Sequence, residues 1–236
     1  MPSLNVTMEP EFFRLAPNDV SIHSTRLYLR TGSPEEFESM DNKLEEAAGL
    51  LATAQVDVIV YGCTAGGVKD GAKSDFNIID QIEKSSGIPA VSTSRAVIEA
   101  LNFLKATKIC IATPYDDNLN QKVVAFCEGN GVHVLSIQGL GYSKGSAWRK
   151  ETSETIYGFA KKASLPEADS LFISCTDLPA IDLIQTLENF LGVPVISSNS
   201  ATMWASLRKI GWDTNIQGYG ALLANLANST LISKMG

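Results

Sequence analysis

The sequence has little of what nucleic-acid-binding, membrane-spanning and secreted proteins need. Its 19 Lys and Arg residues are outnumbered by 26 Asp and Glu, which gives a net charge of −7, whereas nucleic acids and anionic membrane surfaces attract clustered positive charge. No apolar run reaches the roughly 18 residues of a membrane-spanning helix, and residues 1–5 lack the basic and apolar blocks of a signal peptide. We therefore expect a cytoplasmic protein that has neither a nucleic acid nor a membrane as its partner.

Cysteine and histidine are scarce and widely spaced. The four cysteines include no Cys-x-x-Cys pair, and the only histidines are His23 and His133. Zinc sites use close-spaced Cys and His ligands, and disulfide frameworks belong mainly to short secreted chains. The glycine-rich segment 62–71 matches neither G-x-x-x-x-G-K-[ST] nor G-x-G-x-x-G. We therefore expect no metal and no cofactor, and we interpret this segment as a flexible loop over a small site.

Short runs rich in Val and Ile alternate with amphipathic helical patterns along the whole chain. The expected strands are residues 56–61, 90–92, 108–112, 132–137, 170–174 and 193–196. The expected helices are residues 36–54, 74–86, 94–105, 117–129, 151–163, 179–190 and 200–210. Near-continuous apolar strands separated by helices are typical of parallel sheets that are covered on both faces. The sequence therefore predicts an α/β fold.

An internal repeat divides the chain into two related parts. Asp57-Val-Ile-Val-Tyr-Gly-Cys-Thr64 matches Asp169-Ser-Leu-Phe-Ile-Ser-Cys-Thr176, and Gly87-Ile-Pro-Ala-Val-Ser-Thr-Ser94 matches Gly192-Val-Pro-Val-Ile-Ser-Ser-Asn199 in the same order. The first copy has seven extra residues, which fit the glycine-rich stretch 65–72. Two matches in one order indicate two pseudo-symmetric Rossmann-like (flavodoxin-like) halves with parallel sheets and a cleft between them. We predict a first half of residues 1–105, completed by 208–236, and a second half of residues 106–207.

The repeat places Cys63 and Cys175 at equivalent points, where a strand ends and a helix begins. Functional residues of parallel α/β units gather at such points, so two facing halves would bring both thiols to one cleft. The free N–H groups at the start of a helix bind anions such as carboxylates and lower the pKa of a thiol. Two opposed thiols suit proton transfer at both faces of a substrate, or thiolate addition to a double bond followed by rotation and expulsion.

The other candidate residues have simpler interpretations. Cys110 lies within a strand and Cys127 on a helix, where a thiol is usually a small buried apolar group. The two histidines have no partner in a motif, and we interpret both as structural. Asp57 and Asp169 directly precede buried strands, so we interpret them as turn residues rather than as acids of the site.

The two cysteine loops resemble those of the aspartate/glutamate racemase superfamily, within it the maleate cis-trans isomerase and arylmalonate decarboxylase branch. Tyr61-Gly-Cys-Thr-Ala-Gly-Gly67 is similar to the first cysteine loop of that branch, and Ser174-Cys-Thr-Asp-Leu178 is similar to the second. Thr113-Pro-Tyr115 is similar to its tyrosine turn, and Asn5-Val-Thr-Met-Glu-Pro-Glu11 resembles the Asn-x-Thr-Met-Glu stretch of the maleate isomerases. The resemblance covers nearly the whole chain.

This resemblance implies roles for eight residues. Cys63 would be the nucleophile or first acid/base, and Cys175 would be the opposing proton donor. The carboxylate oxygens of a small mono- or dicarboxylate would be held, partly by backbone N–H groups, at Asn5, Thr64, Ala65, Tyr115, Thr176 and Asp177. Arylmalonate decarboxylases keep only the second cysteine, so the presence of Cys63 favours isomerisation or racemisation over decarboxylation.

Two features differ from the pattern of the family. The resemblance implies an apolar strand ahead of the Asn5 turn, and this sequence starts at the turn, so we expect uncovered strand edges in the first half. The maleate isomerases place an asparagine in a loop that corresponds to residues 141–146, where Ser143 or Lys144 would replace it. A diacid other than maleate, or an amino acid derivative, therefore remains an alternative substrate.

Together these features predict a cofactor-independent isomerase of a small carboxylate, most similar to the maleate isomerases. The alternatives are an amino acid or hydantoin racemase, an arylmalonate-type decarboxylase, and a degenerate protein that binds carboxylates without turnover. The sequence leaves the oligomeric state open, although compact α/β proteins often pair, so a homodimer is included among the expectations.

Overall fold

Parallel strands form two separate sheets in the part of the chain that the structure, a computed structural model, describes: residues 1–142 and 151–227. In the first sheet, β1 (Ile59–Tyr61) pairs with β2 (Ala90–Ser92). The second has the order β4-β3-β5-β6. Its members are β3 (Lys108–Tyr115), β4 (His133–Tyr142), β5 (Ser170–Ile173) and β6 (Val195–Ser197). The predicted α/β class with parallel sheets is confirmed.

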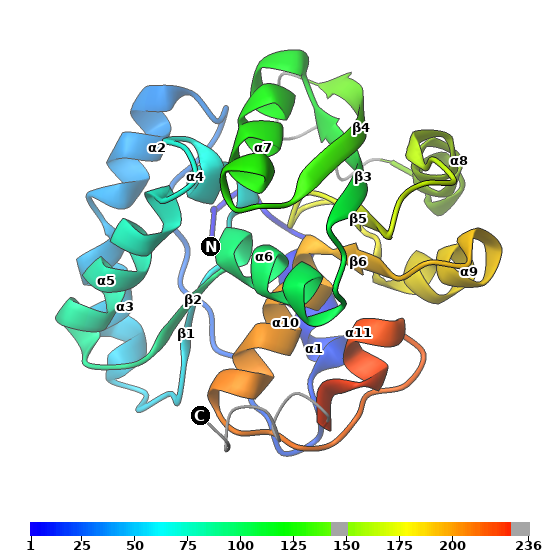
Figure 1. Cartoon of the computed structure of the whole chain (residues 1–236). Helices are drawn as coiled ribbons and strands as arrows, with labels where there is room; N and C mark the ends of the chain where they lie inside the picture. Colours follow the sequence, from blue (N-terminus) through cyan, green and yellow to red (C-terminus); the bar gives the residue numbers. More distant parts are fainter. Residues whose placement is uncertain (143–150, 228–236) are drawn as a thin grey trace.

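Helices follow the strands and cover both sheets. The first part of the chain forms α1 (Met8–Leu15), α2 (Pro34–Asp41), α3 (Leu44–Ala52), α4 (Thr64–Val68), α5 (Ser74–Ser86) and α6 (Thr93–Phe103). The second part forms α7 (Asp117–Gly129), α8 (Ser153–Ala163), α9 (Ile181–Leu191), α10 (Ser198–Lys209) and α11 (Ala221–Ala224). Figure 1 shows α3 and α5 beside the two-stranded sheet, α8 and α9 beside the four-stranded sheet, and α6 and α10 in the middle of the molecule. No helix in the described ranges is long and apolar enough to cross a membrane.

The residues shared by the two copies of the repeat have the same structural tasks in each. Gly87 ends α5 and Gly192 ends α9, both in the left-handed conformation (φ 72° and 73°), which glycine adopts without a steric penalty. Ser92 and Ser197 then cap the next helices, because each side chain accepts a hydrogen bond from a backbone N–H in the first turn. These two helices, α6 and α10, pack against each other and join the halves.

Buried apolar side chains form two clusters. The smaller cluster consists of side chains from the sequence range 27–90. The larger cluster includes side chains of α1, α6, the four-stranded sheet, α10 and α11. The boundary at residue 105 stays a prediction, as does completion of the first half by residues 208–236, of which 228–236 lie outside the described ranges.

Three local predictions need correction. The helix expected at 36–54 is two helices, α2 and α3, separated at residues 42–43, and α1 was not expected at all. The glycine-rich segment is not simply a flexible loop, because Thr64–Val68 is helical and all five residues are buried. Here Gly66 and Gly67 allow close packing: an added Cβ would come within 2.2 Å of Tyr61 Oη and 2.1 Å of Ser94 Oγ.

Candidate active site

Cys63 and Cys175 line one small cavity of about 30 Å³ between the two halves. Each follows the end of a parallel strand, Cys63 after β1 and Cys175 after β5. The cavity is lined by all eight residues proposed from the sequence: Asn5, Cys63, Thr64, Ala65, Tyr115, Cys175, Thr176 and Asp177. Its remaining wall was not anticipated and is largely apolar: Pro2, Leu4, Leu29, Thr31, Gly32 and Phe37. A larger cavity of about 270 Å³ lies elsewhere and includes none of these residues.

The first cysteine loop is held by its own short helix. Cys63 is the N-cap of α4 with extended backbone (φ −150°), and its sulfur accepts a hydrogen bond from the N–H of Gly66 at 3.4 Å. Ser74 donates to the carbonyl of Gly67 at 2.6 Å, which ties the end of the loop to α5. Local hydrogen bonds therefore fix most of this loop.

The second cysteine loop has a strained backbone. Cys175 has a φ of 116°, a region that residues with a Cβ rarely adopt and that is often found at functional sites. Its N–H donates to Ser198 Oγ at 3.0 Å, and its sulfur accepts from the N–H of Asp177 at 3.3 Å. Because this conformation is unfavourable by itself, surrounding contacts must hold it.

Residues 5–7 supply several of these contacts from far away in the sequence. Asn5 Nδ2 donates to Thr176 Oγ1 at 3.0 Å, and Thr7 Oγ1 donates to the carbonyl of Asp177 at 3.1 Å. The Asp177 carboxylate in turn accepts from the backbone N–H groups of Val6 and Thr7, at 2.8 and 3.2 Å. The Asn5 stretch is therefore part of the second loop's support as well as of the cavity wall.

Glu11 extends this support and was missed by the sequence analysis as a site residue. Its carboxylate accepts from the N–H groups of Ala180 and Ile181 at the start of α9, at 2.9 and 3.2 Å. It also accepts from Asn199 Nδ2 at 2.6 Å, and the same amide nitrogen donates to the carbonyl of Thr176 at 3.1 Å. Burial raises the pKa of Glu11 to about 7, against these hydrogen bonds, which lower it.

Ser198 links the two cysteine loops and was also missed. Its hydroxyl lies 2.9 Å from Thr64 Oγ1 in the first loop, and it accepts the N–H of Cys175 in the second. The repeat offered a signal, because Ser198 is the counterpart of Thr93, which bonds to the carbonyl of Tyr61 just before the first loop. The equivalent helices α6 and α10, which follow β2 and β6, therefore each begin beside a cysteine loop.

Tyr115 lies at the end of β3 and is buried. Its hydroxyl is hydrogen-bonded to the Cys175 side chain, and burial raises its pKa well above the ordinary value. Thr113 and Asn120 hold the backbone here: Thr113 Oγ1 donates to Asn120 Oδ1 at 2.6 Å and accepts from the N–H of Tyr115 at 3.2 Å. Tyr115 therefore presents a fixed, protonated hydroxyl beside the second thiol.

The expectation of thiols with lowered pKa values is wrong for this structure. Burial raises the pKa of Cys63 to about 11, with the backbone N–H of Gly66 lowering it in part. Burial raises the pKa of Cys175 as well, with the N–H of Asp177 opposing the effect and the Asp177 carboxylate adding to it. The cost of removing a charged sulfur from water exceeds the benefit of one or two N–H donors. Both thiols are thus predominantly protonated at neutral pH.

The other candidates are not at the cavity. Cys110 and Cys127 are in the core, as predicted, and the side chains of the two histidines are exposed. Asp169 accepts from the N–H groups of Thr107 and Lys108, both at 2.9 Å, which agrees with a turn role. Ser143 and Lys144 lie outside the described residues. Within the described ranges, no group of three or more His, Cys, Asp or Glu side chains is arranged to hold a metal ion.

Known proteins of one family are similar to this chain over most of its length. The family model for arylmalonate decarboxylase matches residues 1–223. A maleate isomerase of Nocardia farcinica is 30% identical over 94% of this chain and 93% of its own length. An arylmalonate decarboxylase of Bordetella bronchiseptica is 26% identical over 89% of this chain and 88% of its own.

Solved structures give the same result. A Cys-to-Ala variant of the maleate isomerase of Pseudomonas putida S16, crystallised with maleate, superposes with a TM-score of 0.91 at 26% identity, and the match covers 95% of both chains. A Cys-to-Ser mutant of the Nocardia farcinica maleate cis-trans isomerase, which carries a covalently bound succinylcysteine intermediate, has a TM-score of 0.90 at 28% identity, covering 95% of this chain and 96% of that one. The chain therefore belongs to the arylmalonate decarboxylase family and shares the fold of the maleate isomerases.

Proposed function

We propose that this chain is a cofactor-independent isomerase that converts a short cis-unsaturated dicarboxylate such as maleate to its trans isomer. The observation that carries the proposal is the shared cavity: Cys63 and Cys175 come from opposite halves and line it together with Asn5 and Tyr115. The succinylcysteine in the Nocardia farcinica relative is the adduct expected when a thiol adds across the double bond of maleate. It supports covalent chemistry at a cysteine in this chain too.

Cys63 is assigned the nucleophile and Cys175 the proton donor. Cys63 first gives its thiol proton to water, and the resulting thiolate attacks one carbon of the double bond. A C–S bond forms while the π bond breaks, and the neighbouring carbon takes the proton of the Cys175 thiol. The remaining C–C single bond then rotates. Cys175 thiolate removes a proton from the same carbon, the double bond forms again, and the C–S bond to Cys63 breaks. No atom is gained or lost, which suits a site that uses only protein groups.

The surroundings of each sulfur agree with this assignment. The Gly66 N–H at 3.4 Å stabilises a thiolate at Cys63, whereas the nearby Asp177 carboxylate favours the neutral, proton-bearing form of Cys175. The hydroxyl of Tyr115 and the amide of Asn5 lie in the cavity wall beside Cys175 and Thr176. We assign one substrate carboxylate to the loop of Thr64 and Ala65 and the other to the loop of Thr176 and Asp177.

Incubation of the purified protein with maleate, followed by proton NMR, tests this function directly. Fumarate should accumulate with the wild-type chain and fail to do so with Cys63→Ala or Cys175→Ala. Cys127→Ala is the matched thiol control, since Cys127 is buried in the core away from the cavity, and it should retain turnover. If both Cys63→Ala and Cys175→Ala leave turnover unchanged, the mechanism is wrong.

Decarboxylation is a second candidate, favoured by the family model and by the relative from Bordetella bronchiseptica. It would release carbon dioxide from an arylmalonate and would depend on Cys175 alone, so Cys63→Ala separates it from isomerisation.

A racemase would instead place solvent deuterium at a substrate stereocentre and leave maleate unchanged. A protein that only binds carboxylates would show an increased unfolding temperature with maleate and no product. A homodimer and a cytoplasmic location stay predictions, and light scattering tests the former.

A further inference from the structure

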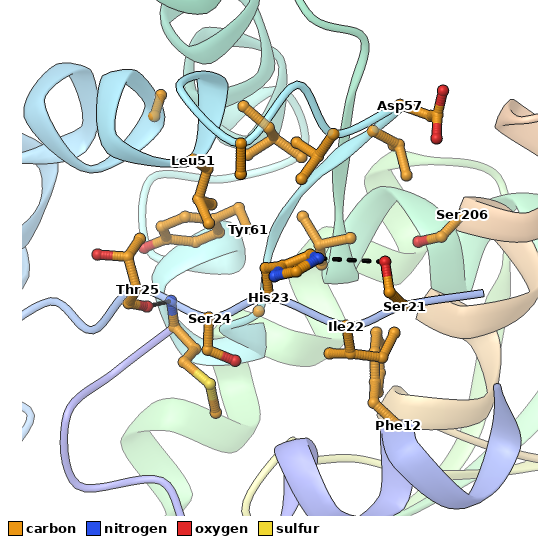
Figure 2. A pocket seen from close by; sticks show the side chains of 18 of the residues that line it. Phe12, Ser21, Ile22, His23, Ser24, Thr25, Leu51, Asp57, Tyr61 and Ser206 are labelled. Atoms are coloured by element: carbon orange, nitrogen blue, oxygen red, sulfur yellow. Dashed lines mark hydrogen bonds between the residues drawn. The ribbon is translucent and has the colours of Figure 1, made fainter.

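The hydroxyl of Tyr61 is a buried polar group that the proposed mechanism does not use. Tyr61 ends β1, two residues before Cys63, and is 2% exposed. Its ring forms part of the wall of the larger cavity of about 270 Å³ (Figure 2), whereas its hydroxyl oxygen is shielded from solvent. Among the described residues, no group makes an aligned hydrogen bond with this hydroxyl. A buried hydroxyl without a partner is unfavourable, so its presence beside a catalytic loop needs a reason.

Gly66 allows this hydroxyl to lie close to the first thiol. A Cβ at Gly66 would come within 2.2 Å of Tyr61 Oη and 3.3 Å of Cys63 Sγ, so both atoms lie on the same side of this glycine. The hydroxyl is within hydrogen-bonding reach of the Cys63 side chain. A neutral thiol is a weak hydrogen-bond partner, whereas a thiolate is a charged acceptor. The hydroxyl therefore gains a strong acceptor only when Cys63 has lost its proton.

Tyr61 keeps its own proton at neutral pH. Burial raises its pKa well above the ordinary value, and the charges of a Cys63 thiolate, of Asp41 and of Asp70 raise it further. The hydroxyl can therefore only donate to a charged sulfur. Other titratable groups also surround the pair, and they are the amino group of Met1, Lys69, Tyr115 and Cys175. Replacement of Tyr61 by Phe leaves all of them in place, so it isolates the effect of the hydroxyl.

The second thiol has a contact of the same kind from a different strand. The hydroxyl of Tyr115, at the end of β3, is hydrogen-bonded to the Cys175 side chain. The repeat places Ile173 at the position that is equivalent to Tyr61, so the second copy has no hydroxyl there. Each cysteine of the cavity is therefore accompanied by one buried tyrosine hydroxyl, although the repeat does not relate the two tyrosines.

We propose that Tyr61 donates a hydrogen bond to the Cys63 thiolate and holds its sulfur in place for attack on the substrate. This inference rests on the assignment of Cys63 as the nucleophile. It adds a second donor to the N–H of Gly66, which contacts the same sulfur at 3.4 Å. Tyr61 stays protonated throughout and the Cys63 proton still goes to water, so the reaction needs no further group.

Tyr61→Phe removes the hydroxyl alone. Loss of one hydrogen bond to a charged group corresponds to at least about tenfold less thiolate, of which the higher nucleophilicity of the more basic sulfur recovers about threefold. Between about pH 7 and pH 9, iodoacetamide should therefore alkylate Cys63 at least about threefold more slowly in the variant. The value of kcat/KM for maleate should fall at least as much. Peptide mass spectrometry separates Cys63 from Cys175, whose alkylation rate in the same cavity should be nearly unchanged.

Stability separates a donor to the thiolate from a structural residue. Tyr61→Phe removes a buried hydroxyl that has no aligned partner while Cys63 is neutral, so the unfolding midpoint should stay the same or rise. Tyr157→Phe is the matched control, because it loses a hydroxyl on α8, where Tyr157 packs against Phe190. It should change neither the alkylation of Cys63 nor the turnover of maleate.

Gly66→Ala tests the position of the hydroxyl. The added methyl group would collide with Tyr61 Oη in the wild-type chain, whereas in Tyr61→Phe it would meet no atom closer than 3.1 Å. Gly66→Ala should therefore lower the unfolding midpoint by several degrees in the wild-type chain and by less than about half as much in Tyr61→Phe.

The proposal is overturned if Cys63 of Tyr61→Phe is alkylated at the wild-type rate, if Cys175 slows as much as Cys63, or if the unfolding midpoint falls with the alkylation rate. Equal effects of Gly66→Ala in both chains would also overturn it. The alkylation measurements need no substrate. A wild-type chain that leaves maleate unchanged would therefore contradict the isomerase assignment, and the contact between Tyr61 and Cys63 would be decided separately.

Discussion

The two cysteine loops share a sequence pattern but are stabilised in different ways. The first has ordinary backbone at Cys63 (φ −150°) and is held by a helix that begins at the loop itself. The second has Cys175 at φ 116° and is held by groups from residues 5–11 and from the start of α10. The two halves are therefore similar in fold, but the contacts that hold the backbone of their cysteine loops differ. A nucleophile and a proton donor can be positioned by different parts of the chain, and each should respond to different substitutions.

The largest test of this difference is chemical. Cys63→Ser and Cys175→Ser should each lower turnover at least about 10³-fold, because each removes a group that bonds to the substrate or transfers its proton. Only Cys175→Ser should accumulate a covalent adduct with the mass of one maleate at the other cysteine, measured by mass spectrometry of the intact protein. An adduct that accumulates in Cys63→Ser instead would exchange the two roles.

Removal of Glu11 should destabilise the protein by about 3 kcal/mol at pH 5, since it leaves the buried N–H groups of Ala180 and Ile181 without their acceptor. Urea denaturation of Glu11→Ala measures this, with Glu9→Ala as the control. Glu9 lies on the same helix but makes a partly exposed ion pair with Arg26, and its removal should cost less than about 1 kcal/mol. Equal losses of stability in Glu11→Ala and Glu9→Ala would contradict the conclusion that Glu11 supports the second cysteine loop.

Glu11 also predicts a dependence of stability on pH. Its pKa of about 7 in the folded chain lies above the ordinary value of 4.5, so the folded state binds more protons than the unfolded state between these values. The contribution of Glu11 to stability is complete below about pH 4.5 and is lost as the pH rises to 7. The free energy of unfolding of Glu11→Gln, measured across this range, should lack the fall. A parallel fall in wild type and Glu11→Gln would assign the effect to other groups.

Ser198→Ala compares the two copies of the repeat directly. It removes the acceptor of the Cys175 N–H and the partner of Thr64, so we expect a loss of about 2 kcal/mol in stability and a roughly tenfold lower kcat. Thr93→Val alters the equivalent position, whose hydroxyl contacts the carbonyl of Tyr61, and should change kcat little. Steady-state kinetics on both variants would show whether the Ser198 hydroxyl, which contacts both loops, matters more for turnover than the Thr93 hydroxyl, which contacts only Tyr61 before the first loop.

Much of the fold was predictable because its signals are local or repeated. Apolar strands and the paired glycines gave the parallel sheets, and the duplicated Cys-Thr steps brought Cys63 and Cys175 to one cavity. Glu11 was not found as a support, because its partners are 169 to 188 residues away and leave no periodic pattern. The helix at Thr64–Val68 was missed because glycines disfavour helices, whereas tight packing against Tyr61 and Ser94 overrides this preference. The pKa values of the thiols depend on burial, which the motif does not reveal.

The smallest predicted effect is a difference in stability between glycine and alanine variants, and we expect it to have opposite signs at Cys175 and Cys63. At position 175 the positive φ penalises any residue with a Cβ, so Cys175→Gly should be more stable than Cys175→Ala by about 1 kcal/mol. At position 63 the backbone is extended, and glycine only adds freedom to the unfolded chain, so Cys63→Gly should be less stable than Cys63→Ala by roughly the same amount. Urea denaturation of the four variants measures both differences. The same sign at both positions would mean that the two loops carry the same strain, and the support from residues 5–11 would then have no conformational penalty to offset.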